Sequence, residues 1–138
     1  MPTFIEQKNQ RNCGQIAVAA LTFATLDKVQ EIIGHKHCTK TKELVAALRA
    51  LGYTCPAKVQ KWSTITWWRA QGIAQVHKEG RGGWHWVAIG VGENGHVQAF
   101  DGLRSGPMDL ADYMKYIEKA YGWRITSFLP VVKIQEAK

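Results

Sequence analysis

The sequence lacks the features of several protein classes. Its three cysteines are an odd number without regular spacing, which excludes a disulfide framework. It has no uninterrupted apolar run near the length of about 18 residues that a membrane span needs. No basic-then-apolar leader occupies Met1–Lys8, which argues against secretion. These absences predict a cytoplasmic protein with free thiols and no contact with a membrane.

Low-complexity linkers and internal repeats are also missing, so we expect one domain over residues 1–138. A chain of this length can bury about two-thirds of its unfolded surface, enough for one core. Helical patterns fill the first half and strand patterns fill the second. The fold class we predict is α+β, with N-terminal helices packed on a C-terminal antiparallel sheet and a cleft between them.

Periodicity and capping residues give the expected elements. The expected helices cover residues 14–25, 26–33, 42–51, 62–70 and 107–121. The expected strands cover residues 55–59, 72–77, 84–91, 97–100 and 125–134. Thr41 is the expected cap of the third helix. Pro130 indicates that the last strand lies at a sheet edge or carries a bulge.

Cys13 stands where a polar loop meets the apolar helix that begins near Gly14. A helix N-terminus carries about half a positive charge, so a cysteine in the first turn has a stabilised thiolate and a lowered pKa. The simpler interpretation is a small core residue beside Asn12. Two glutamines, Gln7 and Gln10, precede the cysteine, and either amide can serve an oxyanion site.

A base for this thiol is expected in the segment GGWHWVAIGVGENGHVQAFDG. Alternating residues after His85, a turn at Gly95 and a second strand up to Phe100 predict a β-hairpin. In such a hairpin the start of the first strand lies beside the end of the second. His85 and Asp101 should therefore meet, and the carboxylate would fix the imidazole tautomer and leave the other nitrogen for the thiol.

With these residues in place, the chain resembles papain-like cysteine peptidases, and within them the C39-type domains that process bacteriocin leaders. Gln7, Cys13, His85 and Asp101 occur in that family's order, and the likeness covers roughly Phe4 to Pro107. The segment KTKELVAALRALGYTCPAKVQKW is similar to the family's helix, turn and strand between nucleophile and base.

The resemblance implies a papain-like fold and the hydrolysis of a peptide or isopeptide bond without a cofactor or metal. It implies that Cys13 attacks the carbonyl, His85 transfers protons, and Asp101 orients His85. It also selects Gln7 over Gln10 as the oxyanion donor, together with the Cys13 N–H. The chain departs from the leader-processing pattern at Asn12 and Gly102, where those domains often have Asp and Pro, and it lacks their usual following membrane span.

The tail GPMDLADYMKYIEKAYGWRITSFLPVV is similar to that of Josephin-type deubiquitinases, which share the order of nucleophile and histidine. Two alternatives to a peptidase remain open at this stage. One is a catalytically inactive papain-like module that binds a peptide, and the other is an acyltransferase or amidase with the same triad. A complete Cys, His and Asp set favours catalysis.

The other histidines have simpler interpretations. His77 and His96 are expected on strands, at the surface or the core edge, and are weaker candidates for the base. His35, His37 and Cys38 offer three metal-binding side chains, but a structural zinc site usually needs four ligands. The sequence therefore does not predict a metal site.

The formal net charge is +7, which favours an acidic partner. The basic residues are spread along the chain without a recognised nucleic-acid motif, so nucleic acid is not the expected partner. The expected partner is a peptide or protein substrate. The loop HKEGRGG before His85 could close over it and favour acidic residues near the scissile bond. Trp84 and Trp86 are expected to shield the imidazole or form the floor of a groove.

Overall fold

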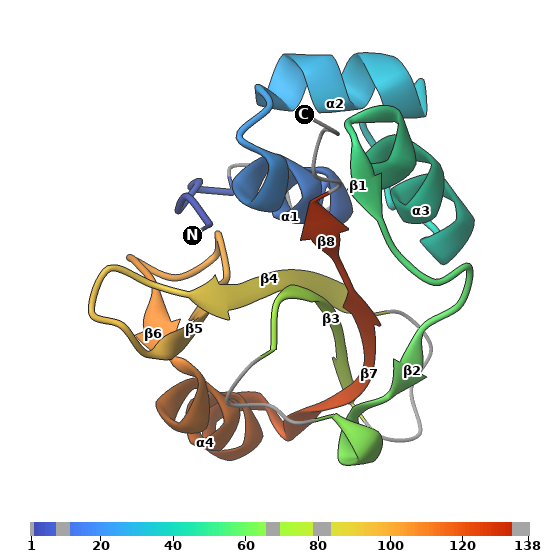
Figure 1. Cartoon of the computed structure of the whole chain (residues 1–138). Helices are drawn as coiled ribbons and strands as arrows, with labels where there is room; N and C mark the ends of the chain where they lie inside the picture. Colours follow the sequence, from blue (N-terminus) through green and yellow to red (C-terminus); the bar gives the residue numbers. More distant parts are fainter. Residues whose placement is uncertain (1, 8–11, 66–69, 79–83, 134–138) are drawn as a thin grey trace.

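The structure is a computed structural model that describes residues 2–7, 12–65, 70–78 and 84–133 (Figure 1). These residues form four α-helices, a short 3-10 helix and antiparallel strands, which confirms the α+β class. The helices are α1 (Cys13–Thr22), α2 (Leu26–Ile33), α3 (Thr41–Ala50) and α4 (Leu110–Tyr121), with the 3-10 helix at Trp62–Thr64. The strands are β1 (Tyr53–Thr54), β2 (Gln60–Lys61), β3 (Gly72–Lys78), β4 (His85–Val91), β5 (Val97–Phe100), β6 (Met108–Asp109), β7 (Trp123–Pro130) and β8 (Val132–Lys133).

The main sheet has six strands in the order β2-β7-β3-β4-β5-β6, and each neighbouring pair is antiparallel. Strands β4 and β5 form the predicted hairpin, with Ala88 opposite Phe100 and Val91 opposite Val97. Gly95 in the turn has a φ of 79°, a conformation that glycine adopts without strain. Strands β1 and β8 form a separate pair beside the helices (Figure 1).

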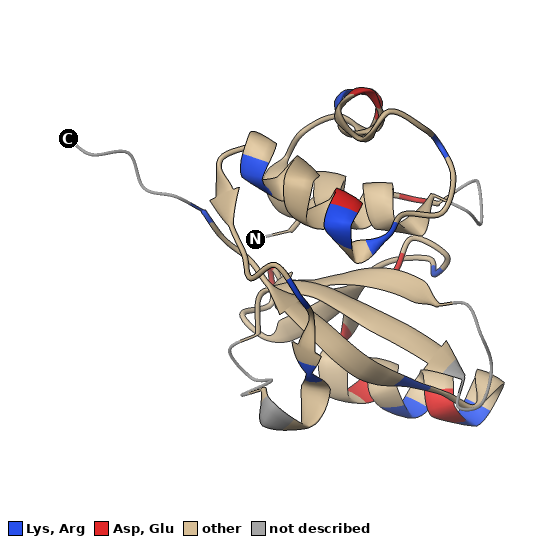
Figure 2. Cartoon of the chain, turned by 90° about the vertical axis from the view of Figure 1, so that its right-hand side faces the viewer, with Lys and Arg blue, Asp and Glu red and all other residues tan. Residues whose placement is uncertain are grey.

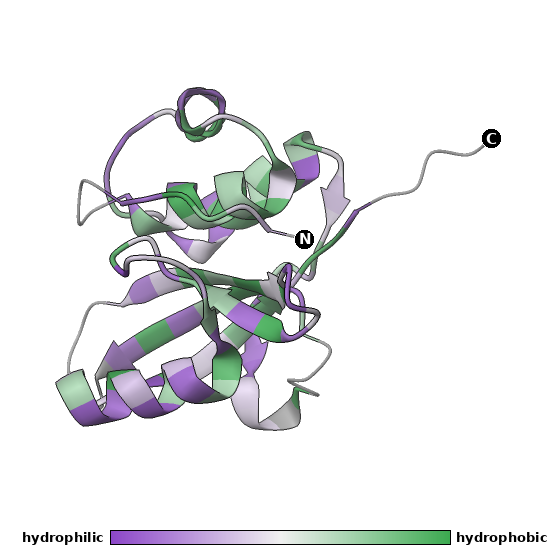
Figure 3. Ribbon diagram, turned by 90° about the vertical axis from the view of Figure 1, so that its left-hand side faces the viewer, coloured by the Kyte–Doolittle hydropathy of each residue, from purple (hydrophilic) through white to green (hydrophobic). Residues whose placement is uncertain are grey.

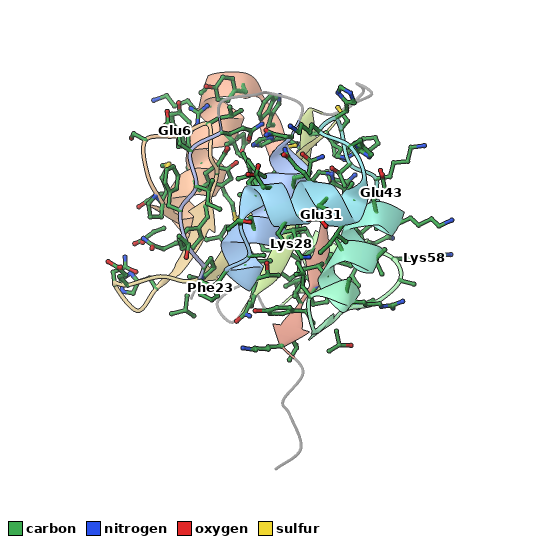
Figure 4. All side chains as sticks on the ribbon, turned by 90° about the horizontal axis from the view of Figure 1, so that it is seen from above. Glu6, Phe23, Lys28, Glu31, Glu43 and Lys58 are labelled. Carbon is green, nitrogen blue, oxygen red and sulfur yellow. The ribbon has the colours of Figure 1, made fainter. Side chains whose placement is uncertain are left out.

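Helices α1, α2 and α3 cover one face of the main sheet (Figure 1). Helix α1 lies against β4 and is apolar along most of its length, as Figure 3 shows. Nine of its ten residues are buried, because α2 and α3 cover the sides that the sheet leaves open. Figure 4 looks down on this layer, with Lys28 and Glu31 on α2 and Glu43 on α3. Helix α1 is thus held on all sides.

Helix α4 covers the opposite face of the sheet, against β5 and β7. It buries one stripe, formed by Leu110, Tyr113 and Ile117. This stripe packs on a second core cluster that includes Val87 and Ile89, while the alternate residues of β4 join the first cluster. Figure 2 shows charged residues along α4, at the far end of the molecule from α2.

Several expected boundaries are wrong for identifiable reasons. Helix α1 ends at Thr22, three residues early, because the Thr22 hydroxyl donates to the Val18 carbonyl and Phe23 adopts a left-handed conformation. Helix α3 begins at Thr41 itself, so Thr41 is not its cap. Residues 55–59 form no strand, because the Cys55 carbonyl accepts from Arg49 and Pro56 has no N–H.

At the C-terminal end, the expected single strand is two strands. Strand β7 has neighbours on both sides, so the expectation that it lies at an edge is wrong. Pro130 is its last residue, opposite Gly72, beyond the point where the short β2 pairs with β7. The alternative expectation, a bulge, is confirmed for β7: the register with β3 passes from Gln75 opposite Ser127 to Val76 opposite Ile125, so Thr126 has no partner on β3 in this register. This irregularity lies away from Pro130. Of the expected helix at 62–70, only residues 62–64 are helical, and 66–69 lie outside the described residues.

Within the described ranges, no helix has both the length and the apolar character needed to cross a membrane.

Candidate active site

Cys13 is the first residue of α1, and its side chain is buried with 6% of its surface exposed. Its Sγ accepts a hydrogen bond from the backbone N–H of Trp86 on β4, at 3.4 Å. The thiol therefore lies at the junction of α1 and the central sheet. The first N–H groups of a helix have no partner within the helix and point toward its N-terminus, where they favour negative charge.

His85 and Asp101 meet as the hairpin predicts. His85 Nε2 lies 2.8 Å from Asp101 Oδ1, and both side chains are buried. The interaction of the imidazole with the Cys13 thiol lowers the pKa of the thiol and raises that of the imidazole, so the two groups are neighbours. Because Asp101 uses Nε2, Nδ1 is the ring nitrogen available to sulfur. His85 thus interacts with both the thiol and the carboxylate.

Two further hydrogen bonds hold the Asp101 carboxylate. The Tyr113 hydroxyl on α4 donates to Oδ2 at 2.7 Å, and the Leu103 N–H donates to Oδ1 at 3.0 Å. Burial raises the pKa of Tyr113, so its hydroxyl remains a donor. These bonds fix the plane of the carboxylate toward His85. Sequence reasoning missed Tyr113, although its place on the apolar stripe of α4 requires a partner for its hydroxyl.

The electrostatics of the three residues favour a charged pair. Burial of the thiol raises its pKa, but the hydrogen bond and charge of His85 and the Trp86 and Gly14 N–H groups outweigh it, so the pKa of Cys13 lies below its ordinary value. Burial lowers the pKa of His85, whereas its bonds to Asp101 and Cys13 raise it, to about 9. Both shifts favour the form of the pair in which the proton is on the imidazole and the negative charge is on sulfur.

The other two cysteines differ from Cys13. Burial raises the pKa of the Cys55 thiol, which the nearby Arg49 only partly offsets. Cys38 is exposed, and none of the three forms a disulfide. Cys13 is the thiol whose surroundings both lower its pKa and supply an imidazole.

Gln7 is brought to the site by the N-terminal segment. Its backbone N–H donates to the Gly102 carbonyl at 2.7 Å, directly after Asp101, and the residue is buried. A Cβ on Gly102 would lie 2.6 Å from the Ile5 carbonyl oxygen and 2.8 Å from Gln7 Cβ. Gly102, one of the two departures from the leader-processing pattern, therefore permits the close approach of this segment. The sequence alone did not reveal this role. Gln10, the rival of Gln7, lies outside the described residues.

Close contacts among Trp86, Thr39 and Gly14 hold α1 against β4. The buried Trp86 donates from its indole nitrogen to the Thr39 carbonyl at 2.8 Å. A Cβ on Gly14 would lie 2.8 Å from Thr39 Cβ and 3.1 Å from Trp86 Cδ1. Trp86 is thus a core residue beside the thiol, while Trp84 is 47% exposed with its ring 6.3 Å from that of Trp86.

The remaining histidines have partners elsewhere. His77 Nε2 lies 2.7 Å from Thr126 Oγ1. His96, which is exposed in the β4–β5 hairpin, has its Nδ1 3.2 Å from Asp109 Oδ2. His35 pairs with Glu43 and stacks on His37. In the part of the chain that the structure describes, no group of three His, Cys, Asp or Glu side chains is arranged to hold a metal. Residues 79–83 of the loop before His85 lie outside that part.

No protein-family model matches this chain, and no curated protein matches it in sequence.

Proposed function

We propose that the protein is a papain-like cysteine peptidase that hydrolyses a peptide or isopeptide bond through Cys13, His85 and Asp101. The observation that carries the proposal is a buried thiol at a helix N-terminus, whose pKa is lowered by a neighbouring imidazole that itself lies 2.8 Å from a carboxylate. Covalent acyl transfer requires a nucleophile, a base that takes its proton and a group that orients the base. The order of Gln7, Cys13, His85 and Asp101 also supports a relationship to C39-type domains.

In the first half of the reaction, the Cys13 thiolate attacks the carbonyl carbon and forms a C–S bond. The carbonyl oxygen becomes negative and accepts from the Cys13 N–H and the Gln7 amide. The His85 imidazolium then gives its proton to the leaving nitrogen, and the C–N bond breaks. An amine leaves, and an acyl-enzyme thioester remains.

In the second half, neutral His85 takes a proton from water while the water oxygen attacks the thioester carbon. The C–S bond breaks, the acyl group leaves as a carboxylic acid, and the Cys13 thiolate and His85 imidazolium are restored. Asp101 stays ionised throughout, because its bonds to His85 and Tyr113 hold its pKa below the ordinary value although burial opposes them.

The proposal includes a peptide or protein substrate and a cytoplasmic place of action. The formal net charge of +7 supports an acidic substrate or partner. Neither a metal nor an organic cofactor has a step in this mechanism.

The direct test is a search for new protein N-termini after expression of the wild-type chain in a bacterial host. The Cys13→Ala variant, expressed to the same level, is the control. We expect a set of termini sharing a sequence pattern in the wild-type sample alone. Equal sets in both samples would reject the peptidase, and acyl groups transferred to amines instead of water would identify an acyltransferase.

A further inference from the structure

A cavity of about 380 Å³ lies beside the Asp101 end of the site. Its wall is the loop from Leu103 to Met108, together with Tyr116 of α4. The same loop is anchored by Asp101, whose carboxylate accepts from the Leu103 N–H and whose carbonyl accepts from the Arg104 N–H at 2.9 Å. The position of this cavity is therefore fixed by the residue that orients His85.

Arg104 is the one charged side chain among the residues that line the cavity within the described part of the chain. Its Nη1 donates to the hydroxyls of Tyr116 at 2.6 Å and Tyr121 at 3.0 Å. The guanidinium carbon also lies 5.2 Å and 5.4 Å from the two ring centroids. The phenols thus hold the cation in one orientation before any ligand arrives.

The hydrogen-bonding capacity of Arg104 is only partly used. Both bonds to the phenols leave from Nη1, so neither uses Nη2 or Nε. The Nε atom is buried without an acceptor in the described residues. No carboxylate of the described ranges forms an ion pair with this guanidinium. The donors of Nη2 are the ones left for a ligand, and a carboxylate suits them because its hydrogen bond to a guanidinium is charge-assisted.

A row of aromatic rings joins Arg104 to the imidazole. The Trp123 ring lies 6.3 Å from the His85 ring, and the Tyr121 ring lies 4.9 Å from that of Trp123. Tyr121 is 39% exposed and Tyr116 is 37% exposed, so the row is open to solvent. In the proposed mechanism His85 protonates the leaving nitrogen, so the part of the substrate that leaves lies on the side of the imidazole.

We propose that Arg104, held by Tyr116 and Tyr121, binds a carboxylate on the leaving-group half of the substrate. The proposal rests on the peptidase function for its position relative to the scissile bond. An acidic side chain of the substrate and the free C-terminus of a short leaving peptide offer the same chemistry. Arg104 is therefore a specificity residue, and its role is binding.

The binding test needs no catalysis. A displayed library of random peptides is selected on the Cys13→Ala protein, on Cys13→Ala with Arg104→Gln, and on Cys13→Ala with Lys28→Gln. Lys28 is exposed on α2 (Figure 4). Helix α2 lies at the far end of the molecule from α4, which holds Arg104, so the Lys28 variant removes the same charge elsewhere (Figure 2). We expect Asp and Glu to be enriched in the first and third selections and not in the second. No acidic enrichment in the first selection, or equal enrichment in all three, overturns the proposal.

The selected peptides are then synthesised with Asp or Glu changed to Asn or Gln, and separately with an amidated C-terminus. Loss of a charge-assisted bond should weaken binding roughly tenfold to a hundredfold. The arm that shows this loss identifies the source of the carboxylate, and no loss in either arm overturns the proposal. Arg104→Gln should reduce the affinity of the parent peptide by the same factor and leave that of the neutral peptides unchanged.

Cleavage of these peptides separates the two proposals. Peptides that bind through Arg104 but are not cut by the wild-type protein support the carboxylate site and reject the peptidase. Peptides that are cut equally by the wild-type protein and Arg104→Gln support the peptidase and reject the carboxylate site. The rate of Cys13 alkylation by neutral iodoacetamide, measured against pH, should be the same in both, which shows that Arg104→Gln leaves the triad intact.

Discussion

The two faces of the main sheet are covered by helices that differ in how much of their surface is buried. Helix α1 buries nine of ten residues beneath α2 and α3, whereas α4 buries a single stripe and turns its other side to solvent. Cys13, the proposed nucleophile, belongs to the first helix. The phenols that hold Arg104 and the hydroxyl that supports Asp101 belong to the second. In our proposal, the buried face holds the thiol that carries out the chemistry, and the open face binds the substrate.

The difference follows from the position of each helix. A helix covered on every side must be apolar all round, and its end residues are held with little freedom. A helix at the surface needs only one apolar stripe, so its exposed positions are free to carry tyrosines and charges. Variants on each face should therefore separate chemistry from binding.

The largest effect is expected at His85, which lies on the sheet between the two helical layers. His85→Ala removes the base and the positive partner of the thiolate, and it should reduce the hydrolysis rate by about four orders of magnitude or more. The rate is measured on the peptides that the wild-type protein cuts. His96→Ala on the exposed hairpin is the matched control and should retain full activity. A His85→Ala protein with wild-type rates would reject His85 as the base.

Gln7→Ala should reduce kcat by roughly a hundredfold to a thousandfold, because it removes one donor to the developing oxyanion. Gln60→Ala, an exposed residue of β2, serves as the control. KM and kcat are measured separately on one peptide. A change in KM alone would assign Gln7 to substrate binding instead of the oxyanion site.

Gly14→Ala tests how tightly the nucleophile helix is packed. The added methyl group would overlap Thr39 and Trp86, and we expect a loss of about 1–3 kcal/mol in the free energy of unfolding. Gly106→Ala is the control, since a Cβ there meets nothing within 4 Å. Chemical denaturation of both variants measures the difference, and equal stabilities would show that α1 can shift away from β4.

Tyr113→Phe should have the smallest effect, about tenfold in kcat, because Asp101 loses one of its donors but keeps His85 and Leu103. Tyr53→Phe is the control, because it also removes a hydroxyl from a buried tyrosine, one that packs in the core cluster of α1 and α3. It should leave kcat unchanged. The pH profile of kcat distinguishes positioning from packing. A merely structural role for Tyr113 would lower stability without moving that profile.

The β4–β5 hairpin and helix α1 could be predicted because both depend on local signals. The alternation after His85 and the turn at Gly95 set the register that brings His85 to Asp101. The polar-to-apolar change near Cys13 marks the start of α1 to within one residue. These features need no knowledge of distant contacts.

The surroundings of the triad could not be predicted, because they depend on how α4 packs. The bond from Tyr113 to Asp101 and the bonds from Arg104 to the phenols exist only when α4 lies across β5 and β7. The close approach of Gln7 to Gly102 depends in the same way on the path of the N-terminal segment. An amphipathic sequence pattern identifies the buried stripe of a helix, but it does not identify the residues against which that stripe packs.

The pH dependence of Cys13 alkylation by iodoacetamide tests the central claim, a thiolate paired with the His85 imidazolium. Because the pKa of Cys13 is lowered and that of His85 is raised to about 9, the charged pair should exist across neutral pH and lose its imidazolium proton near pH 9. We predict selective alkylation of Cys13 at pH 6, reduced roughly a hundredfold by His85→Ala as the thiol returns toward an ordinary pKa. Equal labelling of Cys13, Cys38 and Cys55 at that pH, or no effect of His85→Ala, would contradict the account.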